Sequence, residues 1–194
     1  MADKFSVAMC TYNGARFLGA QLASVAAQTR TPGELVVCDD RSTDETADIV
    51  REFASRAPFP VRYHLNEENL GSTKNFERAV MLCEGEVIVL SDQDDVWLPR
   101  KLARLEEEFA RDPSVLVVFS DASIVEEDSR PVGQGLWESV GLERAELERL
   151  ESGRGIGDLL RGSTVTGATM ALRARLREVV LPFPADLPLI HDAW

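Results

Sequence analysis

The sequence has little of several features that would place it in a specialised class of protein. Its 194 residues include only three cysteines, Cys10, Cys38 and Cys83, in apolar surroundings with no Cys-x-x-Cys pair. We therefore expect buried free thiols rather than a zinc site or a disulfide framework. No apolar run approaches the roughly 20 residues that span a bilayer, and the N-terminus lacks the shape of a signal peptide, which predicts a cytoplasmic protein.

Basic residues are scarce relative to acidic ones. The chain carries 21 Lys and Arg against 33 Asp and Glu, a net charge of -12. This balance argues against nucleic-acid or anionic-membrane binding, which needs a basic face. It is compatible with a phosphate ligand, because a cation held by carboxylates presents positive charge locally. With 44% hydrophobic and 28% charged residues, the composition suits one globular domain.

Short apolar runs alternate with helical patterns up to Asp121. The apolar runs predict strands at 5–10, 34–38, 61–65, 86–90 and 115–120, and helical spacing predicts helices around 18–26, 47–54, 76–83 and 98–109. Ser42 and Glu45 have the spacing of a capping box, and Pro99 suits the first turn of a helix. Continuous apolar strands that alternate with helices predict an α/β fold, with a mostly parallel central sheet and helices on both faces.

The alternation weakens after Asp121, in a stretch rich in Glu, Arg and Gly. Helical patterns recur at 142–150, 156–160 and 174–180, and 164–172 predicts a further strand. Prolines then mark an extended loop that leads to His191 and Asp192. No internal repeat or convincing linker divides the chain, so we expect a single domain over residues 1–194.

Polar side chains follow the predicted strands at the points where these strands end. In parallel sheets of this kind, ligands bind at the carboxyl ends of the strands. The residues at these ends are Thr11, Asn13, Asp39, Asp40, Asp92, Asp94, Asp95 and Asp121. We therefore expect them to converge on one edge of the sheet.

The run Asp92-Gln93-Asp94-Asp95 is the strongest chemical signal. Carboxylates at alternate positions just past a strand can reach a common point, and hard divalent cations prefer oxygen ligands. Such a cation can bridge a diphosphate and neutralise it as a leaving group. The alternative is an acidic turn that caps the following helix. An EF-hand and a P-loop are excluded, because their glycine, glutamate and lysine spacings do not occur.

Other candidates are each open to two interpretations. Asp39 or Asp40 can accept a hydrogen bond from a nucleobase, or belong to an ordinary turn whose Ser42 is an N-cap. Lys74 can face a phosphate, or lie on the solvated surface. Residues 11–14 can form a simple turn, or hold a ligand with backbone N–H groups at a helix start.

The segment near the C-terminus offers one further candidate. Asp192 can act as a general base that deprotonates an acceptor hydroxyl, or be an ordinary exposed carboxylate. The adjacent His191 is more typical of a hydrogen-bonded structural residue than of a ligand.

Six segments in a fixed order make the combined pattern specific. They are VAMCTYNGARFLGAQLASVAAQT, ELVVCDDRSTDET, NLGSTKNFERA, EGEVIVLSDQDDVWLPRKL, VTGATMALR and HDAW. Together they resemble the family 2 glycosyltransferases, closest to bacterial rhamnosyltransferase-like members, over about residues 4–194. The resemblance implies a GT-A fold, with a Rossmann-like nucleotide-sugar-binding part over about 1–121 and an acceptor-side part over about 122–194. Relatives usually continue further, so it also implies a chain truncated at its C-terminus.

The same resemblance implies an activity. It is inverting, metal-dependent transfer of a sugar, hexosyl or rhamnosyl, from a UDP- or dTDP-type nucleoside-diphosphate donor, with Mg2+ or Mn2+ as cofactor. The acceptor would be a glycan or lipid-linked hydroxyl in bacterial polysaccharide or glycolipid synthesis. The place of action would be the cytoplasm, with peripheral contact at the inner face of the membrane.

The donor site can be carried over residue by residue from the family's motifs. The resemblance places Thr11 and Asn13 in the first nucleotide loop and the Lys74 loop beside the nucleotide. It assigns recognition of the base to Asp40, with Asp39 as a second candidate.

The metal and acceptor residues follow from the same comparison. Asp92 and Asp94 form the DxD-type motif, with Asp94 as the best metal ligand and Asp92 or Asp95 assisting. Asp192 matches the catalytic base, although many relatives have Glu-Asp where this chain has His191-Asp192. The stretch around Gly167 would line the sugar or acceptor side.

Two alternatives remain open. A nucleotidyltransferase that makes sugar nucleotides shares the sheet architecture, but it needs a Gly-rich GxGxR-type loop after the first strand, where this chain has TYNGAR. A non-catalytic nucleotide-sugar-binding module is favoured if the truncation removes parts that catalysis needs.

Overall fold

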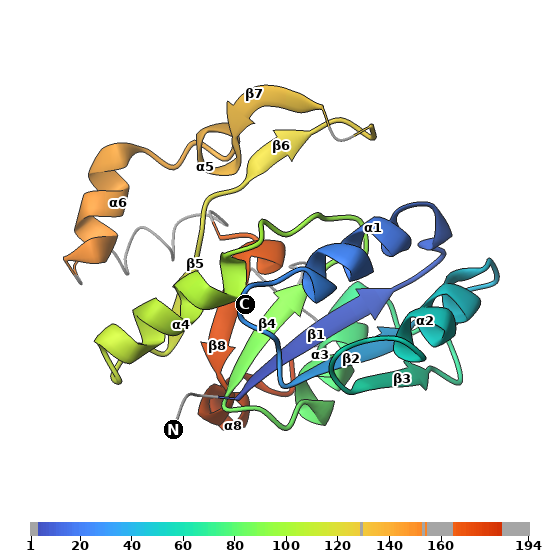
Figure 1. The fold of residues 1–194 in the computed structure, drawn as a ribbon. Coiled ribbons are helices and arrows are strands. Elements are labelled where there is room, and N and C mark those ends of the chain that lie inside the picture. Colours follow the sequence, from blue (N-terminus) through green and yellow to red (C-terminus); the bar gives the residue numbers. More distant parts are fainter. Residues whose placement is uncertain (1–3, 129, 153, 155–164, 184–194) are drawn as a thin grey trace.

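The computed structural model describes residues 4–128, 130–152, 154 and 165–183. Its elements alternate strands and helices over the first half of the chain (Figure 1). They are β1 (Phe5–Thr11), α1 (Ala15–Ala26), β2 (Glu34–Asp39), α2 (Thr46–Ala54), β3 (Val61–Leu65), α3 (Ser72–Leu82), β4 (Val87–Ser91), α4 (Lys101–Arg111), β5 (Val117–Phe119), β6 (Ser123–Val125), β7 (Pro131–Gly135), α5 (Leu136–Ser139), α6 (Arg144–Glu151), η1 (Gly167–Thr169), β8 (Met170–Arg173), η2 (Ala174–Leu176) and α8 (Arg177–Val180).

The central sheet has six strands in the order β3-β2-β1-β4-β8-β5. Strands β3, β2, β1 and β4 run parallel, and β8 is antiparallel to both β4 and β5. Every residue of β1, β2 and β4 is buried, because both faces of these strands are covered. The predicted mostly parallel α/β sheet is confirmed.

Helices cover both faces of this sheet, as predicted. On one face α1, α2 and α4 pack side chains such as Leu22, Val50 and Phe109 against β1, β2 and β4. On the other face α3 packs Phe76 against the same strands, together with apolar side chains from the segment that follows β8. The three layers are visible in Figure 1, with α1 and α4 in front of the strands and α3 behind them.

Several predicted boundaries were wrong. The expected strand over 115–120 is limited to β5, and the one expected over 164–172 begins only at Met170, after the short 3-10 turn η1. The helix expected over 174–180 is divided into the 3-10 turn η2 and the short α8. The pattern at 156–160 lies outside the described residues.

The predicted helix starts around Ser42 and Pro99 were also wrong. Helix α2 begins at Thr46, and no side chain caps it in the expected way, since the Ser42 hydroxyl accepts a hydrogen bond from the Asn13 N–H instead. Helix α4 begins at Lys101, so Pro99 lies before its first turn. A capping signature considers only neighbouring residues in the sequence. Here the Ser42 hydroxyl instead binds the loop that follows β1.

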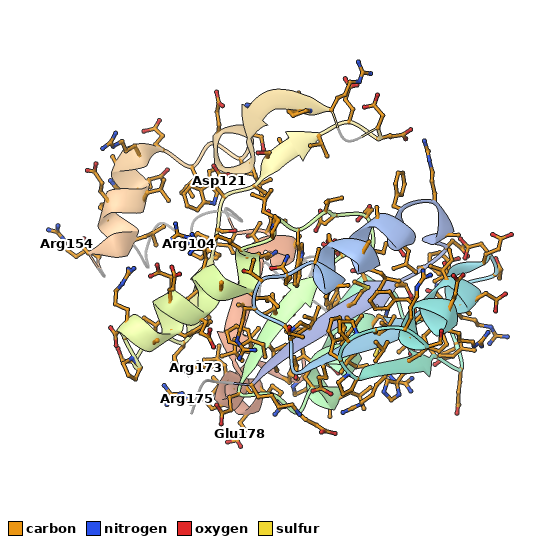
Figure 2. All side chains as sticks on the ribbon, viewed as in Figure 1. Arg104, Asp121, Arg154, Arg173, Arg175 and Glu178 are labelled. Atoms are coloured by element: carbon orange, nitrogen blue, oxygen red, sulfur yellow. The ribbon has the colours of Figure 1, made fainter. Side chains whose placement is uncertain are left out.

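After β5 the chain leaves the sheet and forms the separate two-stranded unit of β6 and β7. Asp121 lies where the chain enters this unit (Figure 2). Its Oδ1 accepts hydrogen bonds from the N–H groups of Ala122, at 2.8 Å, and of Trp137, at 3.0 Å. Asp121 therefore fastens the two ends of the hairpin together, and this is a structural use of its carboxylate.

The three cysteines are buried free thiols, as predicted. Burial raises the pKa of Cys38 to about 11 and that of Cys83 to about 12. It also raises the pKa of Cys10 well above its usual value. Thiols held protonated in this way are poor nucleophiles. In the part of the chain that the structure describes, no helix is both long enough and apolar enough to cross a bilayer.

Candidate functional site at the carboxyl edge of the sheet

The carboxyl ends of β1, β2 and β4 form one edge, and the loops that carry Thr11, Asp39 and Asp92 meet there, whereas the Asp121 carboxylate binds the ends of the β6–β7 hairpin. Thr11 pairs with Asp39 in the ladder between β1 and β2, and both are the last residues of their strands. On the other side of β1, Met9 pairs with Ser91, the last residue of β4, so Asp92 begins the adjacent loop. Parallel pairing thus brings loops from three segments to one place.

Asp39 is fully buried, and the protein itself uses both oxygens of its carboxylate. Oδ1 accepts a hydrogen bond from the Ser42 N–H at 2.7 Å, and Oδ2 accepts one from the Tyr63 hydroxyl at 2.9 Å. Burial, together with this bond and the charge of Asp39, raises the pKa of Tyr63 well above its usual value. Asp39 therefore joins the end of β2 to β3.

The carboxylate of Asp40 organises the loop before α3. Its Oδ1 accepts from the Asn66 side chain at 2.8 Å and from the Leu70 N–H at 2.7 Å, and its Oδ2 accepts from the Gly71 N–H at 2.8 Å. Gly71 has a φ of 76°, in the left-handed region that favours glycine. The side chain is almost entirely buried, and recognition of a base by Asp40 stays a prediction.

The loop from Thr11 to Gly14 is held by the segment that follows β2. Asn13 has a φ of 48°, and its Oδ1 accepts a hydrogen bond from the Thr43 N–H at 2.8 Å. The N–H of Gly14 donates to the Thr46 hydroxyl at 2.8 Å and that of Ala15 to Asp44 at 3.0 Å, so these two N–H groups at the start of α1 already have partners. The Thr11 hydroxyl oxygen, in contrast, is buried and has no hydrogen-bond partner among the described residues.

The loop after β4 carries the acidic run. Asp94 is exposed and Asp95 is half-buried. Burial raises the pKa of Asp95 above its usual value, the charge of Asp94 adds to this shift, and Lys101 opposes it. In the described ranges, no group of three or more histidine, cysteine or carboxylate side chains is arranged to hold a metal ion.

This donor set nevertheless fits Mg2+ or Mn2+. Mg2+ usually binds through one or two carboxylates together with substrate phosphates, rather than in a cage made by protein alone. Asp92 and Asp94 offer hard oxygen donors beside the Thr11 loop. Burial is the main cause of the raised pKa of Asp95, and the charge of Asp94 adds to it; a cation held by these carboxylates would offset the repulsion between them.

Gln21 on α1 contacts the backbone of the acidic loop, and the sequence analysis did not identify it as part of the site. It is fully buried on α1. One orientation of its amide satisfies four neighbours, with Nε2 donating to the Ser24 hydroxyl at 2.8 Å and the Asp95 carbonyl at 2.7 Å, and Oε1 accepting from Ser91 Oγ at 2.8 Å and Trp97 Nε1 at 3.2 Å. The available signal was a glutamine on the apolar face of a helix, three residues after a buried leucine.

Lys101 is a second residue that sequence reasoning missed. Its ammonium donates to the Ala168 carbonyl at 2.7 Å and lies 4.3 Å from the centre of the Trp97 ring. Burial lowers its pKa to about 8, although Asp95 and Asp92 oppose this shift. The sequence signal that could have identified Lys101 is a lysine near a helix N-terminus, where the helix dipole disfavours a cation. Lys101 connects the acidic loop to the turn before β8.

Lys74 lies in the first turn of α3 and has partners within the protein. Its ammonium donates to Glu77 at 2.9 Å and to the Phe183 carbonyl at 3.0 Å. A role of Lys74 beside a nucleotide stays a prediction. In that role its ammonium would share or exchange these two hydrogen bonds with the nucleotide. Asp192 and His191 lie outside the described residues, whereas Gly167 begins the turn η1.

Comparisons with known proteins extend over most of the chain. Residues 6–180 match the sequence model of the family described as Glycosyl transferase family 2. An uncharacterised glycosyltransferase of Nostoc sp. is 34% identical over 131 residues, which are 68% of this chain and 40% of that protein. The chain therefore spans less than half the length of this relative.

Solved structures agree with the observed architecture. The crystal structure of Staphylococcus aureus TarS 1–349 in complex with UDP has a TM-score of 0.72 and 24% identity, and the match covers 98% of this chain and 53% of that one. A mannosyltransferase of Pyrobaculum calidifontis in complex with GDP-Man and Mn2+ has a TM-score of 0.69 and 23% identity, covering 99% and 50%. At these identities the two structures show a common fold.

Proposed function

Since the chain belongs to glycosyl transferase family 2, we propose that it transfers a sugar from a nucleoside-diphosphate donor to an acceptor hydroxyl. The reaction is metal-dependent and inverts the anomeric centre. The observation that carries this proposal is a family match over residues 6–180 on a GT-A fold whose carboxyl edge gathers the Thr11, Asp40 and Asp92 loops. Complexes of structural neighbours with UDP, and with GDP-Man and Mn2+, support the donor class and the cofactor.

In this proposal the protein divides the work between two sides of the donor. The loops at Thr11–Gly14 and Asp40 bind the nucleotide. Asp94 and Asp92 hold Mg2+ or Mn2+, with Asp95 assisting. A divalent cation, when bound, supplies Lewis-acid stabilisation for the diphosphate that leaves.

The transfer is a single displacement. The acceptor oxygen attacks the anomeric carbon from the face opposite the diphosphate, and the proton of the acceptor hydroxyl passes to the carboxylate of Asp192. The bond between the anomeric carbon and the diphosphate oxygen breaks, and its electron pair leaves with the diphosphate. One displacement of this kind inverts the configuration of the sugar. The role of Asp192 rests on the resemblance of the HDAW segment to the family pattern.

The substrates are proposed at the level of class. The resemblance makes dTDP-rhamnose a donor to test beside UDP-hexoses, and a glycan or lipid-linked hydroxyl in bacterial polysaccharide or glycolipid synthesis is the proposed acceptor. We propose the cytoplasm, with contact at the inner face of the membrane, as the place of action.

The proposal is tested by calorimetry with UDP, dTDP and GDP, each with Mn2+ and with EDTA. We expect one nucleotide to bind more tightly with Mn2+, and Asp94→Asn to remove this enhancement. Asp48→Asn, on the exposed face of α2, is the matched control. If Mn2+ enhances the affinity of none of the three nucleotides, the metal-dependent function is wrong.

Turnover of donor sugars tests the catalytic base. We expect Asp192→Asn to lower kcat by about 10²- to 10⁴-fold, as is typical for loss of a general base, with nucleotide affinity unchanged. Nucleotide binding without turnover of any donor would instead favour a non-catalytic binding module.

A further inference from the structure

The side chain of Gln93 joins the acidic loop to the nucleotide loop. Its Oε1 accepts a hydrogen bond from the Tyr12 N–H at 2.9 Å, and its Nε2 donates to the Tyr12 carbonyl at 3.1 Å. The regular pairing of β1 with β4 ends at Met9 and Ser91. Beyond that point the glutamine amide offers Tyr12 one donor and one acceptor, as a neighbouring strand would.

The Gln93 amide occupies the space that a side chain at position 14 would need. A Cβ built on Gly14 would lie 2.1 Å from Oε1 of Gln93 and 2.6 Å from its Cδ. The backbone of Gly14 has φ -98° and ψ 7°, a conformation open to other residues. A glycine at position 14 therefore allows Gln93 to keep this position, and the backbone angles of Gly14 do not themselves demand a glycine.

We propose that Gln93 is a positioning residue that latches the loop of residues 11–14 to the loop of residues 92–95. The latch holds the nucleotide-binding groups and the metal-binding carboxylates at a fixed separation. Occupancy of one loop thereby favours binding at the other, and Mn2+ raises nucleotide affinity through the latch. This inference rests on the proposed function, and Gln93 itself touches neither ligand.

The sequence position of Gln93 strengthens the argument. It lies between Asp92 and Asp94, and its own side chain turns to Tyr12. A glutamate there would lose the donor to the Tyr12 carbonyl and would bring a third negative charge between the two carboxylates. Only the neutral amide provides both hydrogen bonds.

A double-mutant cycle with Gln93→Ala and Gly14→Ala tests the latch. Gln93→Ala removes both hydrogen bonds, whereas Gly14→Ala displaces the flexible end of Gln93 and breaks the same contact. We expect either variant to lower the enhancement of nucleotide affinity by Mn2+, measured as the ratio of the affinities with Mn2+ and with EDTA, about tenfold. In the double variant we expect the Mn2+ enhancement to be about the same as in Gln93→Ala alone, because both changes act on one contact.

Two control variants match these substitutions. Gln134→Ala removes an exposed glutamine on β7, and Gly19→Ala adds a methyl group where nothing lies within 4 Å. Both should keep the full Mn2+ enhancement. Independent losses that multiply in the double variant, or an enhancement that survives in Gln93→Ala, would overturn the coupling.

Amide hydrogen exchange at Tyr12 separates failure of the latch from failure of the proposed function. We expect this amide to exchange at least tenfold faster in Gln93→Ala and in Gly14→Ala than in wild type, with no ligand present. If exchange is unchanged, the latch does not exist, whatever the protein binds. If wild type shows no Mn2+ enhancement, the metal-dependent function fails and the coupling fails with it.

Discussion

Replacing Asp40 with asparagine distinguishes a carboxylate that supports a loop from one that reads a base. Asparagine has nearly the same shape, but it has one acceptor oxygen where Asp40 has two. Oδ1 can be retained for Asn66 and Leu70, and the amide nitrogen then faces the Gly71 N–H, which lies 2.8 Å from Oδ2 in the wild type. Two donors are placed against each other at a site that is almost fully buried.

The expected loss follows from these contacts. One hydrogen bond to a charged group is worth about 1.5–3 kcal/mol, and a buried donor left without a partner costs about 1–3 kcal/mol. Because these two figures partly describe the same loss, we expect Asp40→Asn to lower the free energy of unfolding by about 2–4 kcal/mol. For a domain of this size, each 1 kcal/mol lowers Tm by about 2–4 °C.

The assay is urea unfolding at neutral pH, followed by circular dichroism, with nucleotide affinity measured on the same samples. Asp48→Asn is the matched control, since Asp48 is exposed and, within the described part of the chain, forms an ion pair only with Arg51, at 2.9 Å. It should change stability by less than about 0.5 kcal/mol. If Asp40→Asn unfolds like the control but has lost nucleotide affinity, its carboxylate faces the ligand and the loop argument is wrong.

Two further predictions concern stability. Glu34 is buried, which raises its pKa, but hydrogen bonds from the Ser6 hydroxyl and the Glu84 N–H and the charge of Arg62 outweigh this and lower the pKa overall. A carboxyl whose pKa is lowered in the folded state stabilises the protein at pH values above its unfolded-state pKa and loses this contribution as pH falls. The difference in free energy of unfolding between wild type and Glu34→Gln should therefore shrink in urea titrations below about pH 4.5. A difference that stays constant would contradict this prediction. Leu22→Ala should cost about 2–5 kcal/mol in the same assay because Leu22 is buried under the sheet, and an equal effect of Leu98→Ala, which is 77% exposed, would refute this use of burial.

The parallel part of the fold was predictable because its signal is local. The runs at 5–10, 34–38 and 86–90 are mostly apolar, and such runs are typical of strands covered on both faces. The insertion of β8 between β4 and β5 was not predictable. Its Leu172 pairs with Ile88 and with Val117, so its partners are distant in the sequence and its own four residues carry no sign of them.

The candidate site divides in the same way. Strand ends predicted which residues reach the carboxyl edge, because the direction of a parallel strand determines where its last residue lies. The partners of each carboxylate were not predictable. Asp39 contacts Tyr63 and Asp40 contacts Gly71 only because the fold brings β3 and the α3 loop beside β2. Sequence alone does not distinguish a carboxylate that faces a ligand from one that the protein already uses.

The position of β8 has a consequence for how the chain is made. During synthesis β1 to β4 emerge first and can pair with one another, whereas β5 pairs only with β8 within the described sheet. Met170–Arg173 emerges about fifty residues later, so until then the nascent chain lacks the strand that joins β5 to β4. Long-range strand pairing of this kind is slow and leaves edges exposed. We expect nascent chains that stop before Met170 to be markedly more prone to aggregation and proteolysis than chains that include Arg173.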